Sequence, residues 1–208
     1  MKIAILTTPN QWFEEYAIEF AKKMKAPLFF DYDNISDYEV VFILSYHKII
    51  TKENLNRNKH NIVIHESNLP KGKGWAPLFW QILDGKSEIT FTMFEAGNGI
   101  DSGDIYMQKV LKLSGHELHE EIRKKQAQLT IEMCIEFLNN YAEYRNPTKQ
   151  IGKESYYRRR TSKDSELDIN KTINEQFNLL RIVNNEKYPA FFYKDGHKYI
   201  LTIKKDKR

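Results

Sequence analysis

Short apolar runs alternate with a helical pattern over the first third of the chain. Residues 2–7, 40–44 and 61–65 are mostly apolar, which is the pattern of strands covered on both faces. Residues 11–25 carry apolar side chains at helical spacing, and residues 27–32 are a further strand candidate. Strands that alternate with helices favour an open, Rossmann-like α/β sheet with mostly parallel strands.

The middle of the chain has a different pattern. Residues 75–83 predict a short helix that ends at Gly85. Residues 88–95 and 104–113 alternate apolar and polar positions, as half-exposed strands do, and a glycine-rich segment joins them. We therefore expect two further strands connected by a tight loop.

The last third of the chain predicts helices joined by a linker. Ser114 and Glu117 have the spacing of a capping box, so a helix is expected from there to about residue 144. Residues 148–168 are polar and rich in Lys and Arg, which predicts a linker. A second amphipathic helix is expected over residues 171–185.

The C-terminal pattern completes the expected organisation. Apolar runs on both sides of Asp195-Gly196 predict a β-hairpin, because this dipeptide favours the tight turns that hairpins use. We expect a core over residues 1–145. Residues 146–208 are expected to form the linker and a small helix-and-hairpin extension.

Composition excludes several classes of protein. The chain has 208 residues and one cysteine, so it holds neither an internal disulfide nor a cysteine-cluster metal site. The net charge is +4, which is modest for a nucleic-acid binder. No signal-peptide pattern and no apolar run of the ~18 residues that cross a membrane are present. We expect a cytoplasmic protein with no membrane, nucleic-acid or metal partner; a homo-oligomer is compatible with the pattern.

Three features that could carry chemistry have plainer explanations. His116, His119 and Glu120 share a helix face, but no third segment of metal ligands is evident, so we expect ordinary polar residues. Cys134 lies among apolar helix residues and predicts a packed thiol. The glycines over residues 97–103 are wrongly spaced for a dinucleotide-binding loop, and a strand follows them.

His65 is the strongest candidate for chemistry. It ends a buried strand, and open α/β sheets bind ligands beyond the carboxyl ends of their strands. Asp101 lies in the glycine-rich loop and could face it. A carboxylate beside an imidazole stabilises the charged imidazolium, which suits acid–base catalysis near neutral pH. The residues alone leave two alternatives open, a catalytic His65–Asp101 pair and a structural histidine.

Four motifs in order over residues 37–110 resemble the folate-dependent formyltransferases. Residues 45–50 are similar to the pterin-binding loop of that family, and residues 65–70 to its H-x-S-x-L-P motif. Residues 74–82 resemble the G-x-x-P-x-x-W-x-I helix, and residues 100–105 the D-x-G-x-I signature. This family includes glycinamide ribonucleotide transformylases, methionyl-tRNA formyltransferases and nucleotide-sugar N-formyltransferases.

The C-terminal third narrows the resemblance. Residues 156–168 and 177–192 are similar to the segment that follows the catalytic core in methionyl-tRNA and sugar formyltransferases. Over nearly its full length the chain resembles the N-formyltransferases of pseudaminic-acid-type pathways. These act on a UDP-linked 4-amino-4,6-dideoxy sugar, so residues 1–145 are expected to be the catalytic core of such an enzyme.

The resemblance implies transfer of a formyl group from N10-formyltetrahydrofolate to the amino group of a nucleotide-linked sugar. His65 would stabilise the negative charge that develops on the formyl oxygen, and Asp101 would keep His65 charged and accept or relay the proton of the amine. The residues expected at the folate are Tyr46, Lys48, Ile50, Ala96, Gly97, Asn98 and Asp101. The residues expected at the sugar nucleotide are Glu66, Ser67, Lys73, Trp75, Tyr157, Arg158, Arg159 and Arg160. The three arginines either bind a pyrophosphate or belong to a solvated linker.

One position departs from the family pattern. Most members have an asparagine two residues before the catalytic histidine, where this chain has Val63. Strand alternation puts Asn61, Val63 and His65 on one face, so Val63 should point toward the site. Asn61 and Asn68 are the nearby amides that could replace the missing donor, and we choose Asn68 as the third catalytic residue because it follows His65 directly in the loop.

Two other functions compete with sugar formylation. One is a methionyl-tRNA formyltransferase-like enzyme that lacks the C-terminal tRNA-binding domain, since only a hairpin and a Lys-rich tail are expected after Arg181. The other is a non-catalytic folate-binding protein, which the replacement by Val63 suggests and the presence of His65 and Asp101 opposes.

Overall fold

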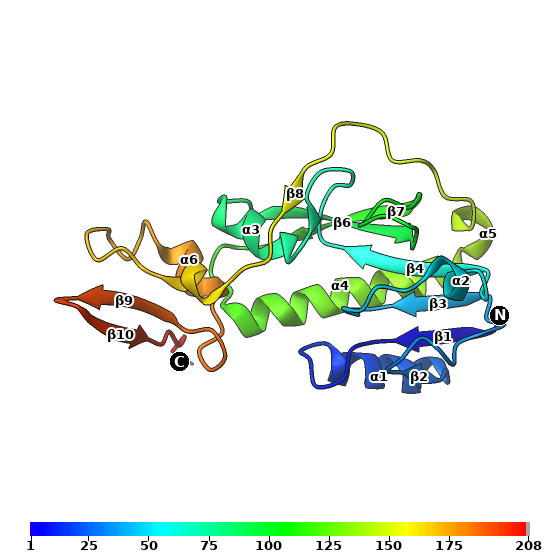
Figure 1. Ribbon diagram of the computed structural model, residues 1–208, viewed down its shortest axis with the longest axis horizontal. Coiled ribbons are helices and arrows are strands. Elements are labelled where there is room, and N and C mark those ends of the chain that lie inside the picture. Colours follow the sequence, from blue (N-terminus) through cyan, green and yellow to red (C-terminus); the bar gives the residue numbers. More distant parts are fainter. Residues whose placement is uncertain (207–208) are drawn as a thin grey trace.

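A computed structural model describes residues 1–206 and contains one six-stranded sheet in the order β2-β1-β3-β4-β6-β7 (Figure 1). Strands β2, β1, β3 and β4 run parallel, whereas β6 is antiparallel to β4 and β7 to β6. This confirms the predicted open, mostly parallel α/β sheet. The strands are β1 (Ile3–Leu6), β2 (Leu28–Phe29), β3 (Val40–Ile43), β4 (His60–His65), β6 (Glu88–Glu95) and β7 (Ile105–Lys112).

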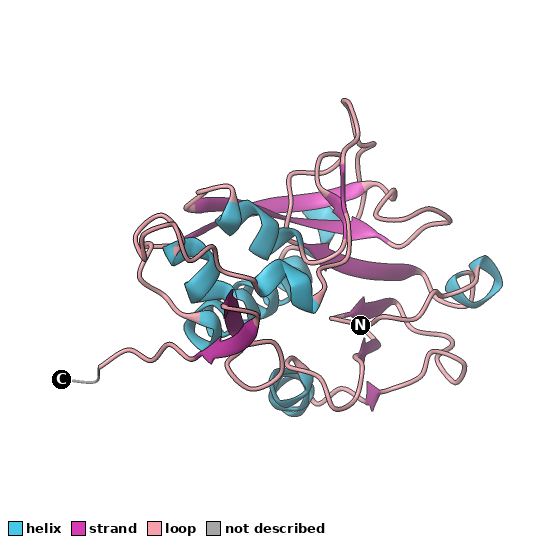
Figure 2. Cartoon of the chain, turned by 60° about the vertical axis from the view of Figure 1, so that its left-hand side comes forward, coloured by secondary structure: helices cyan, strands magenta, loops and turns pink. Residues whose placement is uncertain are grey.

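Helices cover one face of this sheet. They are α1 (Glu14–Met24), α3 (Pro77–Leu83) and α4 (His119–Asn139). Their apolar sides share one core with the sheet, in which Phe20 and Phe137 pack against Phe42 of β3. Figure 2 shows most of the helices gathered on one side of the strands. Apolar burial on this face is the main stabilisation of the fold.

Loops and the short helix α2 (Lys52–Leu55) cover the opposite face. Val41 and Ile43 of β3 point to this side and pack with Leu55, whereas Phe42 between them points to the helices. The same alternation in β4 sends Ile62 to the helices and Val63 to the loops. The loop face is therefore the side on which a ligand can reach the sheet.

Residues 141–206 form an extension that returns to the core. Its elements are α5 (Tyr141–Tyr144), β8 (Tyr156–Tyr157), a 3-10 turn η1 (Ser162–Ser165), α6 (Phe177–Ile182), β9 (Ala190–Lys194) and β10 (His197–Leu201). Strand β8 pairs in parallel with β5 (Lys73–Gly74). The β9–β10 hairpin turns at Asp195 and Gly196, both with positive φ, which confirms the predicted hairpin.

A buried ion pair attaches α6 to the start of α4. Arg181, which is 3% exposed, donates to a carboxylate oxygen of Glu117 at 2.9 Å and to its backbone carbonyl at 3.0 Å. Lys125 donates to the other carboxylate oxygen at 2.5 Å. Removal of one partner from such a buried pair leaves an uncompensated charge, so this contact fixes where the extension lies.

Three predicted elements need correction. The helix expected from Ser114 begins at His119, because Glu117 accepts hydrogen bonds from the backbone N–H groups of Ser114 and Gly115 outside the helix. The helix expected over residues 171–185 shrinks to Phe177–Ile182. The Gln176 side chain bonds the backbone N–H and carbonyl of Asp168, which holds the preceding segment in a turn instead. The expected linker over residues 148–168 contains β8 and η1.

Two further observations concern the described residues 1–206. No helix there is long and apolar enough to cross a bilayer, and no group of three His, Cys, Asp or Glu side chains could hold a metal ion. His119 stacks on Phe79 and pairs with Glu120. Cys134 is fully buried, which confirms the predicted packed thiol.

Candidate active site

His65 lies at the carboxyl end of β4, on the loop face of the sheet. Its side chain is buried, and Nε2 lies 2.9 Å from the carbonyl oxygen of Gly72. A carbonyl only accepts, so Nε2 carries the hydrogen and donates it. The same Nε2 is 3.6 Å from Oδ2 of Asp101, so His65 and Asp101, which the sequence analysis predicted as a possible pair, lie close together in the structure.

Backbone contacts aim the Asp101 carboxylate at His65. Asp101 lies in the loop between β6 and β7 with a φ of +47°. Its Oδ2 accepts a hydrogen bond of 2.8 Å from the backbone N–H of Gly74. Gln150 donates to the backbone carbonyls of Asp101 and Gly103, both at 2.8 Å. The carboxylate is thus held by Gly74, and the backbone that carries it is held by Gln150.

The loop that carries Asp101 crosses the end of β6 very closely. A Cβ atom on Gly103 would lie 1.6 Å from the carbonyl oxygen of Glu95, so only glycine fits there. On the other side of the loop, the N–H of Ala96 donates to the carbonyl of Asn61 at 2.7 Å. This packing gives the glycine of the D-x-G-x-I motif a physical purpose, since it lets the loop return Asp101 toward β4.

The segment after His65 is held by the extension. Gly72 donates to the Ser155 hydroxyl at 2.9 Å, and Lys73 donates from its backbone to the Ser155 carbonyl at 2.9 Å. The side chain of Lys73 is 2% exposed, and its ammonium pairs with Glu154 at 2.5 Å. Glu154 and Ser155 therefore help to hold the segment after His65, although the sequence analysis expected them only as part of a linker.

The third catalytic group is not supplied by Asn61. Val63 lies on the loop face with His65, as strand alternation requires. The amide of Asn61 is buried, where it donates to the Leu55 carbonyl at 2.9 Å and accepts from the Tyr32 hydroxyl. Its hydrogen-bonding capacity is thus engaged within the fold.

Asn68 is exposed and turns toward the antiparallel half of the sheet. Its side-chain oxygen accepts a hydrogen bond of 3.1 Å from Gln108 of β7. Over residues 1–206, no hydrogen bond joins Asn68 to His65 or Asp101. Its role as the third group stays a prediction.

The residues expected at the folate share one side of the site. Tyr46, Ile50, Val63 and Ala96 are partly buried against the same loop-face cluster and form an apolar wall. In the described part of the chain, no hydrogen bond engages the backbone N–H of Lys48 or Ile50, and the Lys48 ammonium is held by Asp31 at 2.6 Å. Gly97 and Asn98 are exposed in the loop above. The wall and the free backbone groups suit a flat heteroaromatic ring.

The residues expected at the acceptor lie on the other side, and they are not equivalent. Trp75 is 44% exposed, and the guanidinium carbon of Arg159 is 5.0 Å from the centre of its ring. Trp80 stacks on Tyr157 and donates to the carbonyl of Arg158 at 2.9 Å.

Other residues expected to contact the substrate are buried or bonded within the protein, although the buried Ser67 hydroxyl has no hydrogen-bond partner in residues 1–206. Ser67 is 2% exposed, and Lys73 is buried as described above. Glu66 accepts a hydrogen bond of 2.5 Å from Gln126 of α4. Arg158 and Arg160 both contact Asp164. These side chains shape the walls of the site from within.

Sequence reasoning missed the residues that act on the site from a distance. His47 stacks on Trp75 with 6.2 Å between ring centres, and Gln150 and Ser155 bond the two loops of the site. Each contact joins segments that are remote in the chain, and no local pattern marks them. The glycine at 72, with its positive φ, was the one visible signal of a tight turn.

A second polar cluster lies at the amino end of β4. Both ring nitrogens of His60 are bonded, one to the Tyr106 hydroxyl and one to the Tyr141 hydroxyl, each at 2.9 Å. Tyr106 also donates to Glu95. Burial lowers the pKa of the His60 imidazole and raises the pKa of the Glu95 carboxyl. With both nitrogens engaged, His60 has no capacity left for a substrate.

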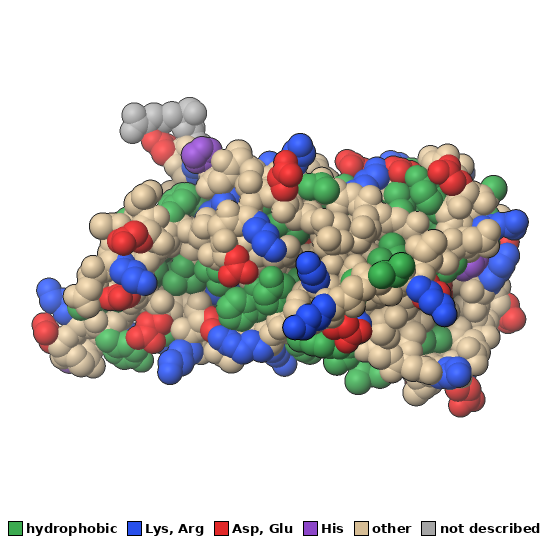
Figure 3. All heavy atoms as spheres, turned by 90° about the horizontal axis from the view of Figure 1, so that it is seen from above, with side chains coloured by type: hydrophobic (Ala, Val, Ile, Leu, Met, Phe, Trp, Pro, Cys, Tyr) green, Lys and Arg blue, Asp and Glu red, His purple; other side chains and the backbone are tan. Residues whose placement is uncertain are grey.

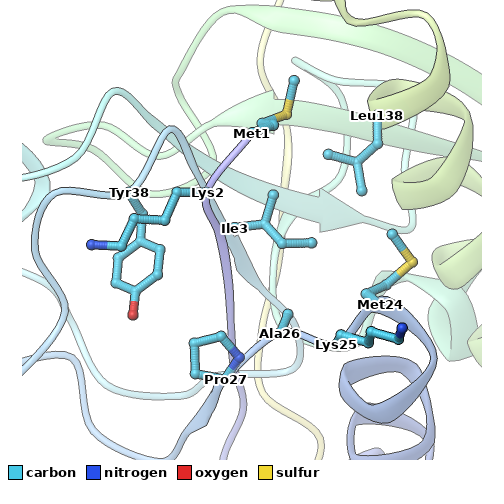
Figure 4. Close-up of a pocket in the computed structure, with 9 residues that line it drawn as sticks. All are labelled: Met1, Lys2, Ile3, Met24, Lys25, Ala26, Pro27, Tyr38 and Leu138. Atoms are coloured by element: carbon cyan, nitrogen blue, oxygen red, sulfur yellow. The ribbon is translucent and has the colours of Figure 1, made fainter.

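A shallow cavity of about 410 Å³ lies at the amino-terminal edge of the sheet (Figure 4). Met1, Ile3, Met24, Pro27, Tyr38 and Leu138 line it, with the side chains of Lys2 and Lys25 at its rim. Ile3 pairs with Val40, which pairs with His60, so this cavity is at the opposite end of the strands from His65. It holds none of the predicted site residues.

Comparison with known proteins identifies the family of this fold and site. A family model described as formyl transferase matches residues 6–138. The methionyl-tRNA formyltransferase of Ehrlichia ruminantium (strain Gardel) is 32% identical over 160 residues, which are 76% of this chain and 51% of that protein. The chain spans about half the length of the curated relatives it matches.

Solved structures share the fold at low sequence identity. A methionyl-tRNA formyltransferase from Clostridium thermocellum superposes with a TM-score of 0.82 at 22% identity, over 100% of this chain and 94% of that one. A sugar N-formyltransferase from a Shewanella species gives 0.71 at 16% identity, over 99% and 98%. HypX from Aquifex aeolicus in complex with tetrahydrofolic acid gives 0.70 at 14% identity, over 98% and 37%.

Proposed function

The chain belongs to the formyl transferase family, and from that premise we propose that it transfers a formyl group from N10-formyltetrahydrofolate to the 4-amino group of a nucleotide-linked, UDP-type 4-amino-4,6-dideoxy sugar. One observation carries the proposal. Nε2 of His65 is 3.6 Å from the carboxylate of Asp101 at the loop-covered carboxyl end of β4. A proton donor and a proton acceptor thus face one place where a substrate can enter.

Each residue of the pair has a separate task. During transfer a bond forms between the acceptor nitrogen and the formyl carbon, the bond from that carbon to N10 breaks, and the proton that the amine loses ends on N10, which leaves as the secondary amine of tetrahydrofolate. Asp101 is placed to accept this proton, because its carboxylate is held by the Gly74 N–H rather than by a Lys or Arg side chain of residues 1–206, while Gln150 fixes its backbone carbonyl. His65 stabilises the charge that develops on the formyl oxygen, which is an electrostatic contribution made mainly in the transition state.

The folate has a matching surface on one side of this pair. The apolar wall of Tyr46, Ile50, Val63 and Ala96 can cover the pterin ring. The unengaged backbone N–H groups of Lys48 and Ile50 can bond its polar edge. The loop over residues 96–101 borders the same side, and its tip at Gly97 and Asn98 is exposed and can close over the ring.

The acceptor is assigned to the side formed by the extension. Trp75, Tyr157 and Arg159 lie there, next to the Gly74 N–H that bonds Asp101. Solved structures of a sugar N-formyltransferase and of a methionyl-tRNA formyltransferase both align over nearly the whole of this chain, extension included, so the acceptor is assigned to this part from its side chains. A phosphate-bearing sugar suits the exposed guanidinium at this side.

A methionyl-tRNA formyltransferase-like activity is the second candidate. The curated relatives named above favour it, since they are methionyl-tRNA formyltransferases that match this chain over about half of their length. The formyl donor and the His65–Asp101 pair are the same for both candidates. Only the acceptor differs, so an experiment with both acceptors decides between them.

The experiment offers the purified protein N10-formyltetrahydrofolate with either a UDP-linked 4-amino-4,6-dideoxy sugar or methionyl-tRNA. Release of tetrahydrofolate is followed by absorbance, and the product is identified by mass spectrometry. We expect N-formylated sugar from the wild type and none from His65→Asn. Formylation of the tRNA alone would support the second candidate. Folate binding without transfer to either acceptor would support a non-catalytic protein.

A further inference from the structure

Three consecutive arginines of the extension have different surroundings. Arg158 donates to both carboxylate oxygens of Asp164, one of them at 2.8 Å. Arg160 donates to the Asp164 backbone carbonyl at 3.0 Å and is partly buried. Arg159 is exposed, and over residues 1–206 its guanidinium makes no hydrogen bond or ion pair. Only the middle arginine therefore keeps a full set of donors for a ligand.

The free guanidinium is nevertheless held in place. Its central carbon lies 5.0 Å from the centre of the Trp75 ring, a cation–π distance. Trp75 in turn stacks on His47, with ring centres 6.2 Å apart and an angle of 16° between the planes. The backbone N–H of His47 donates to the Thr8 hydroxyl at 3.1 Å. A chain of contacts thus connects Arg159 to the loops that follow β1 and β3.

This arrangement lies next to the reacting groups. Trp75 directly follows Gly74 in the chain, so the Cα atoms of Gly74 and Trp75 are about 3.8 Å apart. The backbone N–H of Gly74 donates to the Asp101 carboxylate. In the sheet, β1 lies between β2 and β3. The strand order therefore reverses between β1 and β3, and the loops that follow these two strands meet at their carboxyl ends. Ligands of open α/β sheets bind at such a point.

The surroundings of His47 are positively charged. Burial lowers the pKa of its imidazole, and the charges of Arg159 and Arg123 lower it further. Figure 3 looks onto the side of the molecule that carries α3 and β8, where Lys, Arg, Asp and Glu side chains lie among exposed apolar ones. The attraction for an anion at Arg159 therefore comes from its own guanidinium rather than from the charge of the whole face.

We propose that Arg159 binds the diphosphate of a nucleotide-linked acceptor, and that Trp75, supported by His47, is the positioning residue for its guanidinium. The proposal rests on the proposed function and deepens it. It assigns to Arg159 alone the phosphate contact that the sequence analysis expected from all three arginines. The acceptor's amino group then lies at the Asp101 end of this side and its nucleotide at the outer end.

The charge balance favours a nucleotide diphosphate over an RNA. Binding of an RNA backbone depends on several cations that neutralise successive phosphates. Here Asp164 already compensates Arg158 and bonds Arg160, which leaves one uncommitted guanidinium in the run. A single planar fork matches one diphosphate group.

Binding of UDP in the absence of folate tests the proposal by isothermal titration calorimetry. Arg159→Gln should weaken UDP binding by about 10- to 100-fold, the factor given by the loss of a charged hydrogen bond. Arg159→Lys should weaken UDP binding by a smaller factor, because lysine keeps the positive charge but lacks the planar guanidinium that donates two parallel hydrogen bonds. Trp75→Leu should weaken UDP and inorganic pyrophosphate alike. Arg145→Gln, an exposed arginine outside the site, is the matched control.

Steady-state kinetics separates this proposal from the proposed function. Arg159→Gln should raise KM for the nucleotide sugar while kcat stays near the wild-type value, since the contact is uniform binding. Unchanged KM and UDP affinity in an enzyme that formylates the sugar would overturn the role of Arg159 alone. Arg159-dependent UDP binding by a protein that formylates no sugar would keep this role and reject the function. Tighter, Arg159-dependent binding of a CCA trinucleotide than of UDP would overturn the diphosphate assignment.

Discussion

Strand β4 begins and ends with a histidine, and the two have opposite surroundings. At its amino end, His60 has both ring nitrogens bonded to tyrosine hydroxyls, one from the buried Tyr106 and one from the partly buried Tyr141. At its carboxyl end, His65 uses Nε2 on the Gly72 carbonyl and has Asp101 at 3.6 Å. Over residues 1–206, no hydrogen bond engages the Nδ1 of His65. One histidine is satisfied by the fold, and the other keeps a free nitrogen beside a carboxylate.

The difference shows why burial alone does not identify a catalytic histidine. His60 is 9% exposed and His65 is 7% exposed, so solvent access does not separate them. The partners do. The hydroxyls of Tyr106 and Tyr141 engage both nitrogens of His60 in a closed network that stabilises the fold, and although the Glu95 carboxylate lies 3.9 Å from Nδ1, no nitrogen is left unbonded there. A carboxylate and an unbonded nitrogen make a group that can gain or lose a proton when a substrate arrives.

His65→Ala should have the largest effect of any change at β4. Turnover should fall by about 10²- to 10⁴-fold, the usual contribution of a general acid–base group. The thermal midpoint should change far less than in a variant of His60, because His65 makes a single protein hydrogen bond. The assay follows formylated product by mass spectrometry, with circular dichroism as the check on folding. Near-normal turnover would remove His65 from the mechanism.

Asp101→Asn should come next, with a loss of at least ~10²-fold in turnover. The amide can still accept the hydrogen bond from Gly74 through its oxygen, so the loop should keep its place. What the variant loses is the negative charge that faces His65 and the site for the proton. Folate affinity, measured separately by fluorescence, should change little. A variant that keeps its rate would show that the carboxylate only shapes the loop.

His60→Phe should reverse the pattern, with stability lost and turnover per folded molecule kept. The variant removes the His60 partner of both tyrosines: Tyr106 keeps its hydrogen bond to Glu95, whereas the partly buried Tyr141 hydroxyl loses its partner, and an unsatisfied buried polar group costs about 1–3 kcal/mol. Chemical denaturation followed by tryptophan fluorescence measures the free energy of unfolding. A loss of turnover as large as that of His65→Ala would contradict the division between the two ends.

The same variant should change how acid affects stability. The pKa of His60 is lowered by burial, so below about pH 6.5 the unfolded chain takes up a proton that the folded one refuses. The wild type should therefore lose free energy of unfolding as the pH falls through this region. His60→Phe should lose less over the same interval. Equal pH dependence in both proteins would mean that other groups cause the acid loss.

Val63→Asn should give the smallest effect, and its direction is informative. Val63 shares the loop face with His65, where most of the family has an amide. If the site has no third donor, the new amide should raise turnover or leave it unchanged. If Asn68 or a bound water already serves, the amide should compete and turnover should fall. Asn68→Ala measured beside it separates these cases, because loss of an oxyanion donor costs about 10²- to 10³-fold.

The sequence predicted the fold and the central pair because both depend on local patterns. Apolar runs located β1, β3 and β4, and the ordered motifs placed His65 at the end of a strand and Asp101 in a loop, where the two meet. The helix boundaries at Ser114 and residue 171 failed because side chains there bond the backbone in turns. No local pattern could show that β8 pairs with β5, that Lys73 is buried, or that Arg159 differs from its neighbours. Those features come from contacts between remote segments.

A crystal structure with a folate and the UDP-linked amino sugar bound together tests the central claim most directly. The account predicts that both ligands lie at the carboxyl end of β4. The acceptor nitrogen should be within ~3.2 Å of Asp101 or His65, the reach of a hydrogen bond. The pterin should lie on the Val63 side. Ligands seated elsewhere, such as in the cavity at the amino end of the strands, or an acceptor nitrogen remote from both residues, would contradict it.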